Sequence, residues 1–216
     1  MNPDVAAFGA MHQRMVDSQL RARGIADERV LDAMTRVPRH EFVAERYRDQ
    51  AYEDHPLPIS EGQTISQPYI VALMLELLTP KASDRVLEVG TGSGYATALL
   101  AELTAHVVSV ERHVPLAEEA AQSLSRLGYT NVKVIVGDGS QGFLEDAPYD
   151  AILVSAAAPV VPPMLVGQLA EGGRMVIPVG SADAQQLQLI HMRNGQPHAM
   201  LRELCRFVPL ISDAKA

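Results

Sequence analysis

Residues 85–101 most constrain the fold of this chain, because they read as a buried strand, a tight turn and the start of a helix. The strand is short and apolar, as a parallel strand covered on both faces is. The glycines of the turn lack a Cβ, so the backbone can bend sharply and approach a ligand closely. The following helix directs its free N–H groups at whatever lies above the turn. Such a unit predicts a nucleotide site at the carboxyl end of a parallel sheet. The apolar positions are Val86, Leu87 and Val89, and the glycines are Gly90, Gly92 and Gly94.

The spacing of the glycines indicates which nucleotide is bound. Dinucleotide-binding turns are usually spaced G-x-G-x-x-G, which leaves room for a pyrophosphate. This chain instead has G-x-G-x-G from Gly90 to Gly94, with Glu88 two positions before the first glycine. That form resembles motif I of methyltransferases that use S-adenosyl-L-methionine (SAM), which carries an ammonium, a sulfonium and a ribose but no phosphate. We therefore expect Glu88, Gly90, Thr91, Gly92 and Gly94 in a cofactor site.

Two further strand ends carry acidic residues that suit the same ligand. Residues 106–110 form an apolar strand that ends in Glu111, which follows Gly90 by 111 − 90 = 21 positions. At an offset of about 20 an acidic side chain meets the ribose hydroxyls in such folds. Residues 132–136 form a third strand, followed by Asp138, which could accept a hydrogen bond from the adenine amino group. Three strand ends with matching chemistry favour a SAM site over the alternative, tight turns with solvated acids.

The alternation of strands and helices predicts an α/β fold: a Rossmann-like class I methyltransferase with a mostly parallel, doubly wound sheet. Five parallel strands precede a C-terminal antiparallel hairpin that turns at Asn194-Gly195. An N-terminal helical segment comes before them. Helices are expected at residues 11–23, after Asp27 as N-cap, at 67–78, at 115–127 and at 162–170, with Gly24 ending the first and Gly172-Gly173 the last.

The composition of the chain narrows the class of protein. With 216 residues, 47% of them hydrophobic, it suits one compact unit, in which residues 1–80 pack on a SAM-binding domain at 81–216. The single cysteine, Cys205, allows no intrachain disulfide and makes a thiolate metal site unlikely. No apolar run approaches the roughly 20 residues of a membrane span, and no secretory signal is evident, so we expect a cytoplasmic protein. The net charge of −8, without a dense basic cluster, argues against a nucleic-acid partner.

Residues 51–66 form an irregular loop before the helix at 67–78. Ser66 allows two interpretations. It can be only the N-cap of that helix, worth about 1 kcal/mol. Alternatively, Thr64, Ser66 and the free N–H groups of the helix form an anion site that suits a carboxylate. His55 in the same loop could serve as a base, but a structural hydrogen-bonding role is favoured.

A series of short motifs runs through the chain: Gly62–Tyr69 (GQTISQPY), the turn at 90–95, VGDG at 136–139, APYDAI at 147–152, AAAP at 156–159, GGR at 172–174, IPVG at 177–180 and FVPL at 207–210. Together they resemble the protein-L-isoaspartate O-methyltransferase family, from about Asp17 to Leu210. The turn at 90–95 alone resembles the whole SAM-dependent superfamily. The stretch Gly62–Tyr69 is more specific, because in the family it forms the substrate loop. The resemblance strengthens the anion-site interpretation of Ser66.

The resemblance implies a repair enzyme. We expect a monomer, although the sequence does not give the oligomeric state. A methyl group passes from SAM to the free α-carboxylate of an L-isoaspartyl residue in a damaged protein or peptide, leaving S-adenosyl-L-homocysteine. The methyl ester then closes to a succinimide without the enzyme. No metal is implied, and no strong base, because a carboxylate is already ionised at pH 7. Ser66 is the implied catalytic residue, with Thr64, Ala157 and Pro209 at the substrate. The implied cofactor residues are Gln63, Thr64, Ile65, Ser66, Ser93, Glu111, Arg112, Gly137 and Asp138.

Three positions depart from the family pattern, namely Ser60, Ser155 and Ile211, and they bear on the shape of the site. Residues 1–13 lie outside the resemblance and receive no role. Three other function classes agree less well with these motifs. The substrate loop argues against a small-molecule methyltransferase, and the strand end at 155–159 lacks the motif of nucleic-acid amino methylation. A SAM-binding protein without activity would be expected to lack Ser66 or the glycine turn, and both are present.

Overall fold

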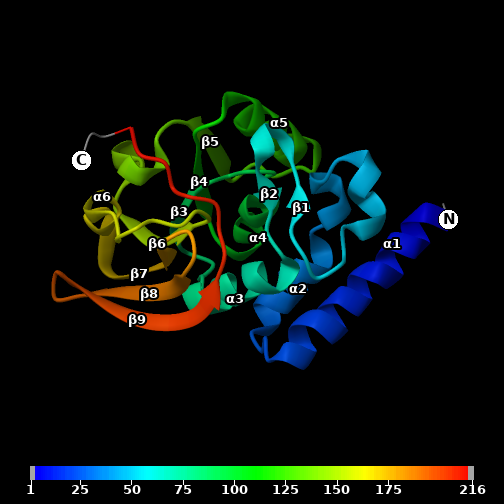
Figure 1. The fold of residues 1–216 in the computed structure, drawn as a ribbon, viewed down its shortest axis with the longest axis horizontal. Helices are drawn as coiled ribbons and strands as arrows, with labels where there is room; N and C mark the ends of the chain where they lie inside the picture. The colour runs from blue at the N-terminus through cyan, green and yellow to red at the C-terminus, as the bar shows by residue number, and fades with distance from the viewer. Residues whose placement is uncertain (1–2, 214–216) are drawn as a thin grey trace.

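A central sheet organises the computed structural model, which describes residues 3–213. Within them, seven strands lie in the order β5-β4-β3-β6-β7-β8-β9. The first five in this order are parallel, and β8 and β9 form an antiparallel hairpin at one edge (Figure 1). The predicted fold class is therefore confirmed. The strands are β3 (Arg85–Val89), β4 (His106–Glu111), β5 (Val132–Val136), β6 (Tyr149–Val154), β7 (Leu169–Gly180), β8 (Gln185–Arg193) and β9 (Gln196–Cys205).

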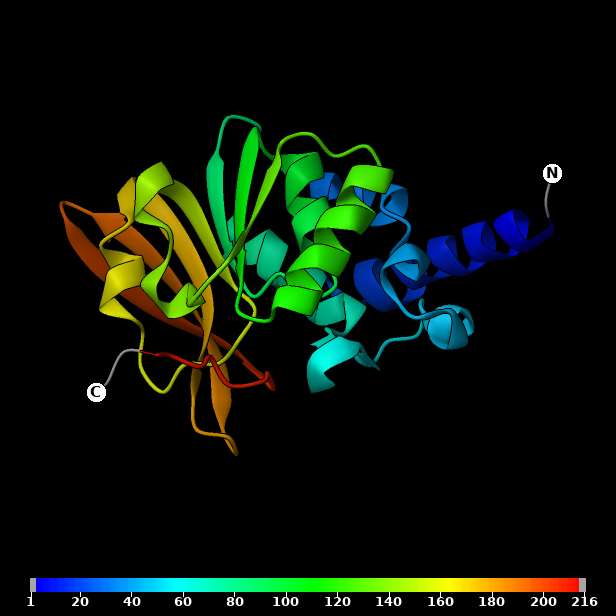
Figure 2. The ribbon, with the colours of Figure 1, turned by 90° about the horizontal axis from the view of Figure 1, so that it is seen from above.

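Helices lie on both sides of this sheet, in layers of unequal thickness (Figure 2). The thick layer holds α2, α3, α4 and α5, and the thin layer holds the one-turn helix α6. The first helix, α1, extends away from the rest of the molecule. The helices are α1 (Pro3–Arg14), α2 (Glu28–Arg36), α3 (Pro68–Leu78), α4 (Tyr95–Leu103), α5 (Val114–Arg126) and α6 (Pro163–Val166).

The side chains of each strand pack alternately against the two helical layers, because successive side chains of a strand point to opposite faces. In β3, Val86 packs in the cluster under the thick layer, whereas Leu87 and Val89 pack in the cluster on the other face. Both faces are apolar, which is why the strand reads as an almost continuous apolar run. Glu88 shares the face of Val86 and is the polar exception, fully buried under α4.

The N-terminal helices share the core of the sheet. Met15, Leu31 and Met34 belong to the same hydrophobic cluster as Leu99 of α4 and Leu153 of β6. Burial of such side chains stabilises the packing by about 1.5–3 kcal/mol each. The division of the chain into residues 1–80 and 81–216 remains a prediction.

The predicted end of the first helix at Gly24 and the predicted start of the second after Asp27 are confirmed, but the predicted start of the first helix is not. Gly24 takes a left-handed conformation with φ of 96° directly after the helical segment. The Asp27 carboxylate accepts a hydrogen bond from the backbone N–H of Arg29 at 3.0 Å and caps α2. The helical segment begins at Pro3 rather than at Met11, and it continues as a π-helix over Met15–Leu20. Residues 1 and 2, which also received no role, lie outside the described residues.

The helix predicted at 162–170 is wrong over its second half. It ends at Val166, and β7 already begins at Leu169. The pair Gly172-Gly173 lies inside this strand, where the register with β6 shifts. A Cβ on Gly173 would lie 2.7 Å from the carbonyl oxygen of Ala170, so this irregular strand segment needs glycine. The glycines therefore form a bulge and do not end a helix.

Two segments outside the main sheet shape its carboxyl edge. A small antiparallel hairpin of β1 (Leu57–Pro58) and β2 (Thr64–Ile65) holds the loop before α3. After β9 the chain crosses the ends of the parallel strands (red in Figure 1), where Pro209 pairs with Ala157. These two segments are the walls of the site described below.

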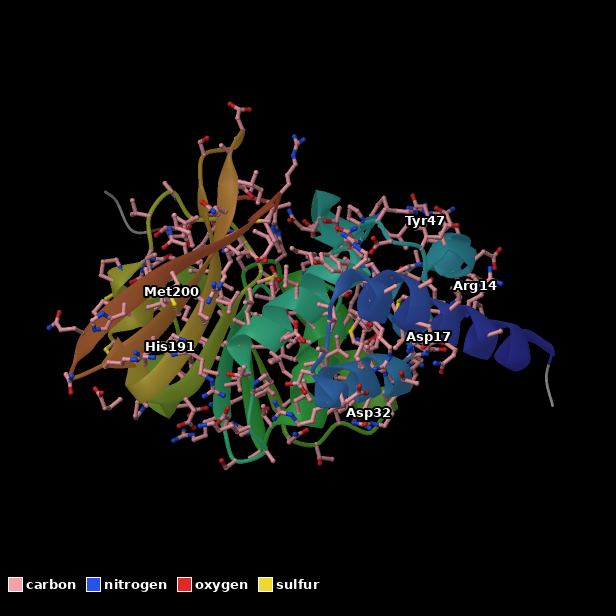
Figure 3. All side chains as sticks on the ribbon, turned by 90° about the horizontal axis from the view of Figure 1, so that it is seen from below. Arg14, Asp17, Asp32, Tyr47, His191 and Met200 are labelled. Atoms are coloured by element: carbon pink, nitrogen blue, oxygen red, sulfur yellow. The ribbon has the colours of Figure 1, made fainter. Side chains whose placement is uncertain are left out.

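The N-terminal helices and the β8–β9 hairpin lie at opposite ends of the molecule (Figure 3). Figure 3 shows Asp17 and Asp32 on the N-terminal helices and His191 and Met200 on the β8–β9 hairpin at the opposite end. Across residues 3–213, no helix is both long enough and apolar enough to span a membrane.

Candidate active site

A cavity of about 350 Å³ opens where the parallel strands end. Val89 lies in register with Val110 of β4 and Val154 of β6, so the chain segments after these strands converge at one edge. Most of its lining comes from five segments: residues 62–66 before α3, 89–93 after β3, 110–113 after β4, 153–156 at the end of β6 and 207–211 after β9. The site thus lies at the carboxyl edge that the sequence predicts.

The glycine turn forms the floor of the cavity through Gly90, Thr91, Gly92 and Ser93. Gly90 and Gly92 have φ of 92° and 54°, values that favour glycine. Gly94, which is also predicted to bind cofactor, does not line the cavity. A Cβ there would lie 3.2 Å from the Cβ of Ala120, so Gly94 allows α5 to pack closely against the turn.

Glu111 is placed as its offset from the turn predicts. Its side chain is 5% exposed and lines the cavity. One carboxylate oxygen accepts a hydrogen bond from the Gly92 N–H at 2.9 Å, and the other accepts from the His113 N–H at 3.0 Å. Each oxygen has further lone pairs for a ligand hydroxyl. Glu111 therefore connects the ends of β3 and β4 and presents a negative charge to the cavity.

Glu88 lies beneath the turn and does not line the cavity. Oε2 accepts hydrogen bonds from the Thr97 hydroxyl at 2.5 Å and the Ser109 hydroxyl at 2.6 Å, and Ser109 also contacts Thr91 at 2.6 Å. Oε1 is buried without a partner. Burial raises the pKa of Glu88 to about 7, against the lowering effect of the two hydroxyls. The structure thus assigns Glu88 to the support of the glycine turn.

Replacing Glu88 by Gln should remove a pH-dependent destabilisation. The folded-state pKa of about 7 lies above the ordinary value of 4.5, so the protonated folded form is favoured. The contribution of protonated Glu88 to the free energy of unfolding is fully present below pH 4.5 and is lost as pH rises through 7. The shift corresponds to about 3 kcal/mol, and Gln carries no charge to bury. We compare the free energy of unfolding of Glu88→Gln with that of the parent at each pH. We expect this difference to shift in favour of the variant by about 2–3 kcal/mol as the pH rises from 5 to 8.

Urea unfolding at several pH values measures this difference. Glu118→Gln is the matched control, because Glu118 lies exposed on α5 and should give a nearly flat difference. A flat difference for Glu88→Gln as well would contradict a raised pKa at this position.

The end of the third strand contributes differently from what the sequence predicts. Gly139 lines the cavity, whereas Gly137 and Asp138 do not. The Asp138 carboxylate accepts from the Ser140 N–H and hydroxyl on one oxygen and from the Asp213 N–H at 2.9 Å on the other. Burial raises its pKa, but these hydrogen bonds outweigh that effect and the net pKa is lowered. The C-terminal segment therefore lies against the predicted adenine residue.

Arg112 fixes the same segment from the other side. Its guanidinium donates to the Ile211 carbonyl at 3.2 Å and to the Asp213 carboxylate at 3.3 Å. Both Arg112 and Ile211 line the cavity. Residues 207–211 thus form a wall from which sequence reasoning named only Pro209 as a binding residue, although the FVPL motif was a signal for the whole wall.

The loop at residues 62–66 presents Ser66 to the cavity. Gln63, Thr64 and Ile65 line it as well, and Ile65 is anchored in the core at 4% exposure. The Ser66 carbonyl accepts a hydrogen bond from Arg39 at 2.8 Å. Within residues 3–213, nothing is hydrogen-bonded to the Ser66 hydroxyl, which leaves it free for a ligand.

The N-cap interpretation of Ser66 is wrong, and one N–H group of the nearby helix end is already occupied. Gln67 is the N-cap of α3, and its side chain makes no capping bond. The Asp54 carboxylate instead accepts from the Tyr69 N–H at 3.3 Å and from the Gln67 side-chain amide at 2.8 Å. Asp54 also pairs with Arg23, whose guanidinium stacks on the Tyr69 ring. The carboxylate of Asp54 thus occupies the N–H of Tyr69 at this helix end.

A second groove, of about 470 Å³, adjoins the first cavity. Thr64, Ser66 and Ser155 line both, so Ser66 lies where the two spaces meet. Tyr69 and residues 203–208 complete the groove. Ala157 lines neither space. It is buried and exchanges backbone hydrogen bonds of 2.8 Å with Val208 and Leu210, so it holds the wall that carries Pro209.

The three departures from the family pattern have defined places. The Ser60 hydroxyl donates to the Glu119 carboxylate at 3.0–3.1 Å and ties the loop to α5. Ser155 lines both spaces, and Ile211 lines the first. His55 bonds to Pro56 and Glu53 outside both spaces, as a structural residue would. Among residues 3–213, no cluster of three metal-ligating side chains is found.

The cavity fits SAM by its donor set and shape. Its volume lies within the usual range for small-ligand sites, roughly 300–1,000 Å³. The Glu111 carboxylate suits a ribose hydroxyl pair, and the exposed backbone of Gly90 and Gly92 allows close approach. Gly139 keeps the neighbouring turn close, because a Cβ there would lie 2.5 Å from Val89. Apolar walls from Val89, Val110 and Leu210 suit an adenine ring.

Comparisons with known proteins agree with this geometry. The family model for Protein-L-isoaspartate(D-aspartate) O-methyltransferase (PCMT) matches residues 10–215. A protein-L-isoaspartate O-methyltransferase from Koribacter versatilis is 56% identical over 212 residues, which cover 98% of this chain and 96% of the relative. A solved protein-L-isoaspartate O-methyltransferase is similar with a TM-score of 0.85 and 30% identity, over 94% of this chain and 66% of the other. A Plasmodium falciparum structure named for the same activity, in complex with S-adenosyl-L-homocysteine, is similar with a TM-score of 0.81 and 31% sequence identity. The match covers 93% of this chain and 98% of the other.

Proposed function

This chain belongs to the protein-L-isoaspartate(D-aspartate) O-methyltransferase family, and from that membership we propose how its residues divide the work. The enzyme transfers a methyl group from SAM to the α-carboxylate of L-isoaspartyl residues in damaged proteins and peptides. This step starts their repair through a succinimide. The observation that supports the division of roles is the position of Ser66, at the junction of the cavity and the adjoining groove.

We propose that the cavity is the cofactor half of the site. Glu111 would accept hydrogen bonds from the ribose hydroxyls, and Gly90, Thr91, Gly92 and Ser93 would lie along the amino-acid part. Arg112 would flank the adenine, with Gly137 and Asp138, which do not line the cavity, shaping the turn behind it and Gln63 and Ile65 closing the loop side. Bound SAM supplies an electrophilic methyl group. The residues of this half bind and orient the ligand, and no proton has to move there.

We propose that the groove receives the isoaspartyl peptide. The acceptor carboxylate is an anion at pH 7, so the chain has only to hold one oxygen in line and exclude water. The Ser66 hydroxyl would donate a hydrogen bond to the other oxygen, with Thr64 beside it. Apolar side chains of Val71 and Met74 line the space behind the loop and limit water there. Pro209, held by Ala157, lines the cavity but not the groove, so it would bound the acceptor group from the cavity side.

We infer the remaining properties from the sequence. The charge of −8 and the absence of a dense basic cluster in the sequence support a protein substrate rather than nucleic acid. A monomer in the cytoplasm is proposed, with residues 1–80 packed on a SAM-binding unit at 81–216. Sedimentation of the purified protein tests the monomer.

A structure with S-adenosyl-L-homocysteine and an isoaspartyl peptide tests the division of roles. We expect the ribose hydroxyls within hydrogen-bond distance of Glu111 and the peptide carboxylate within that distance of the Ser66 hydroxyl. A peptide bound away from the groove, or a ribose away from Glu111, would overturn the assignment.

A further inference from the structure

Arg39 is a fully buried cation close to the acceptor side of the site. It lies in the short turn Arg39–Phe42 after α2 and is 0% exposed. Its Nε donates to the Ala51 carbonyl at 2.7 Å, and one Nη donates to the Ser66 carbonyl at 2.8 Å. The other Nη is buried without a hydrogen-bond partner. Arg39 therefore connects the N-terminal layer directly to the backbone of Ser66.

The charge of Arg39 is also uncompensated. Among residues 3–213, no carboxylate lies within ion-pair distance of it. The carboxylate that influences it most is Asp54, which already pairs with Arg23 and binds the start of α3. Burial lowers the pKa of Arg39 to about 10, so it remains a cation at pH 7. A buried charge without a counterion is costly, and such groups are usually paired or serve a ligand.

Arg174 shows what a purely structural buried arginine looks like in this fold. It is 5% exposed and donates to the backbone carbonyls of Leu78, Asp150 and Thr79. It also forms an ion pair with the buried Asp84 carboxylate. Its donors and its charge are thus satisfied within the protein, and it lines neither the cavity nor the groove. Arg39 shares the carbonyl clamp but lacks the internal counterion.

Both contacts of Arg39 toward the site involve residues that line the cavity. Ser66 is one, and the other is Tyr95, over whose ring the guanidinium lies at 4.9 Å from the centroid. We propose that Arg39 is a positioning residue for the acceptor carboxylate. Its clamp fixes the Ser66 backbone so that the hydroxyl faces the substrate, and its unpaired charge lies behind the loop that receives the anion. This inference rests on the proposed function of Ser66.

Two substitutions separate the clamp from the charge. Arg39→Lys keeps the charge but loses the planar fork that binds two carbonyls, so we expect kcat on an isoaspartyl peptide to fall about 10-fold with KM little changed. Arg39→Met loses both, and we expect kcat/KM to fall about 100-fold, with a clear rise in the peptide KM. The dissociation constant for S-adenosyl-L-homocysteine should stay within about threefold in both, since Arg39 makes no hydrogen bond to Glu111 or to the glycine turn.

Arg174→Lys is the matched control, because it changes a clamped, buried arginine away from the site. It should alter the melting temperature but not the peptide KM or kcat. The inference is overturned if folded Arg39→Lys and Arg39→Met match the parent, or if cofactor binding weakens in parallel with peptide turnover. It is also overturned if Arg174→Lys loses as much turnover as Arg39→Lys. Failure of the parent enzyme to methylate the peptide would instead refute the proposed function.

Discussion

Ser66→Ala is expected to lower kcat/KM for an isoaspartyl peptide by about 10- to 100-fold, because a hydrogen bond to a charged group contributes about 1.5–3 kcal/mol. The hydroxyl is free in the folded protein, and it lies where the cavity and the groove meet. Its loss removes a donor to the carboxylate but no contact that holds the loop, since Arg39 binds the Ser66 carbonyl and Ile65 fills the core. Turnover and SAM affinity, measured on the same preparation, test this, and the affinity should change little.

Ser60→Ala is the matched control for this experiment. Ser60 lies in the same loop, but its hydroxyl donates to Glu119 of α5. We expect the control to keep turnover close to that of the parent. Unchanged turnover in Ser66→Ala would contradict the acceptor role, and helix capping could not be offered in its place because Asp54 binds the start of α3.

Glu111→Ala is expected to weaken SAM binding by about 100-fold, corresponding to about 3 kcal/mol for two hydrogen bonds to a carboxylate. The carboxylate lines the cavity and also accepts from the N–H groups of Gly92 and His113. Its removal therefore loses ribose contacts and loosens the glycine turn at the same time. Calorimetric titration with S-adenosyl-L-homocysteine measures the affinity.

The control for Glu111 is Glu118→Ala, which removes an exposed carboxylate from α5. Its affinity should match the parent's. An unaltered affinity in Glu111→Ala would contradict the proposed binding of the ribose by Glu111 at the end of β4.

Local signals in the sequence were sufficient for the parts of the site that adjoin the strand ends. The glycine turn follows an apolar strand directly, and the 21-residue offset placed Glu111 in the cavity. The alternation of side chains along β3 also predicts that Glu88 faces away from the ligand. It shares the face of Val86, under α4, whereas Val89 ends the strand at the cavity. The expectation for Glu88 ignored that period of two.

Contacts between distant segments were beyond the sequence signals. Asp54 occupies the start of α3 from 15 positions upstream, and Arg39 reaches the Ser66 carbonyl across 27 positions. Neither pair has a local spacing that predicts it. The end of the short helix α6 was also predicted too late in the chain, because Gly172-Gly173 can end a helix or form a bulge in a strand, and only the pairing of β7 with β6 decides between them.

Methyl transfer from labelled SAM to two matched peptides tests the central claim most directly. One peptide carries L-isoaspartate, and the other carries normal L-aspartate at the same position. We expect label in the isoaspartyl peptide alone, released by base as a methyl ester requires. Equal labelling of both peptides, or labelling of neither while SAM is bound, would contradict it.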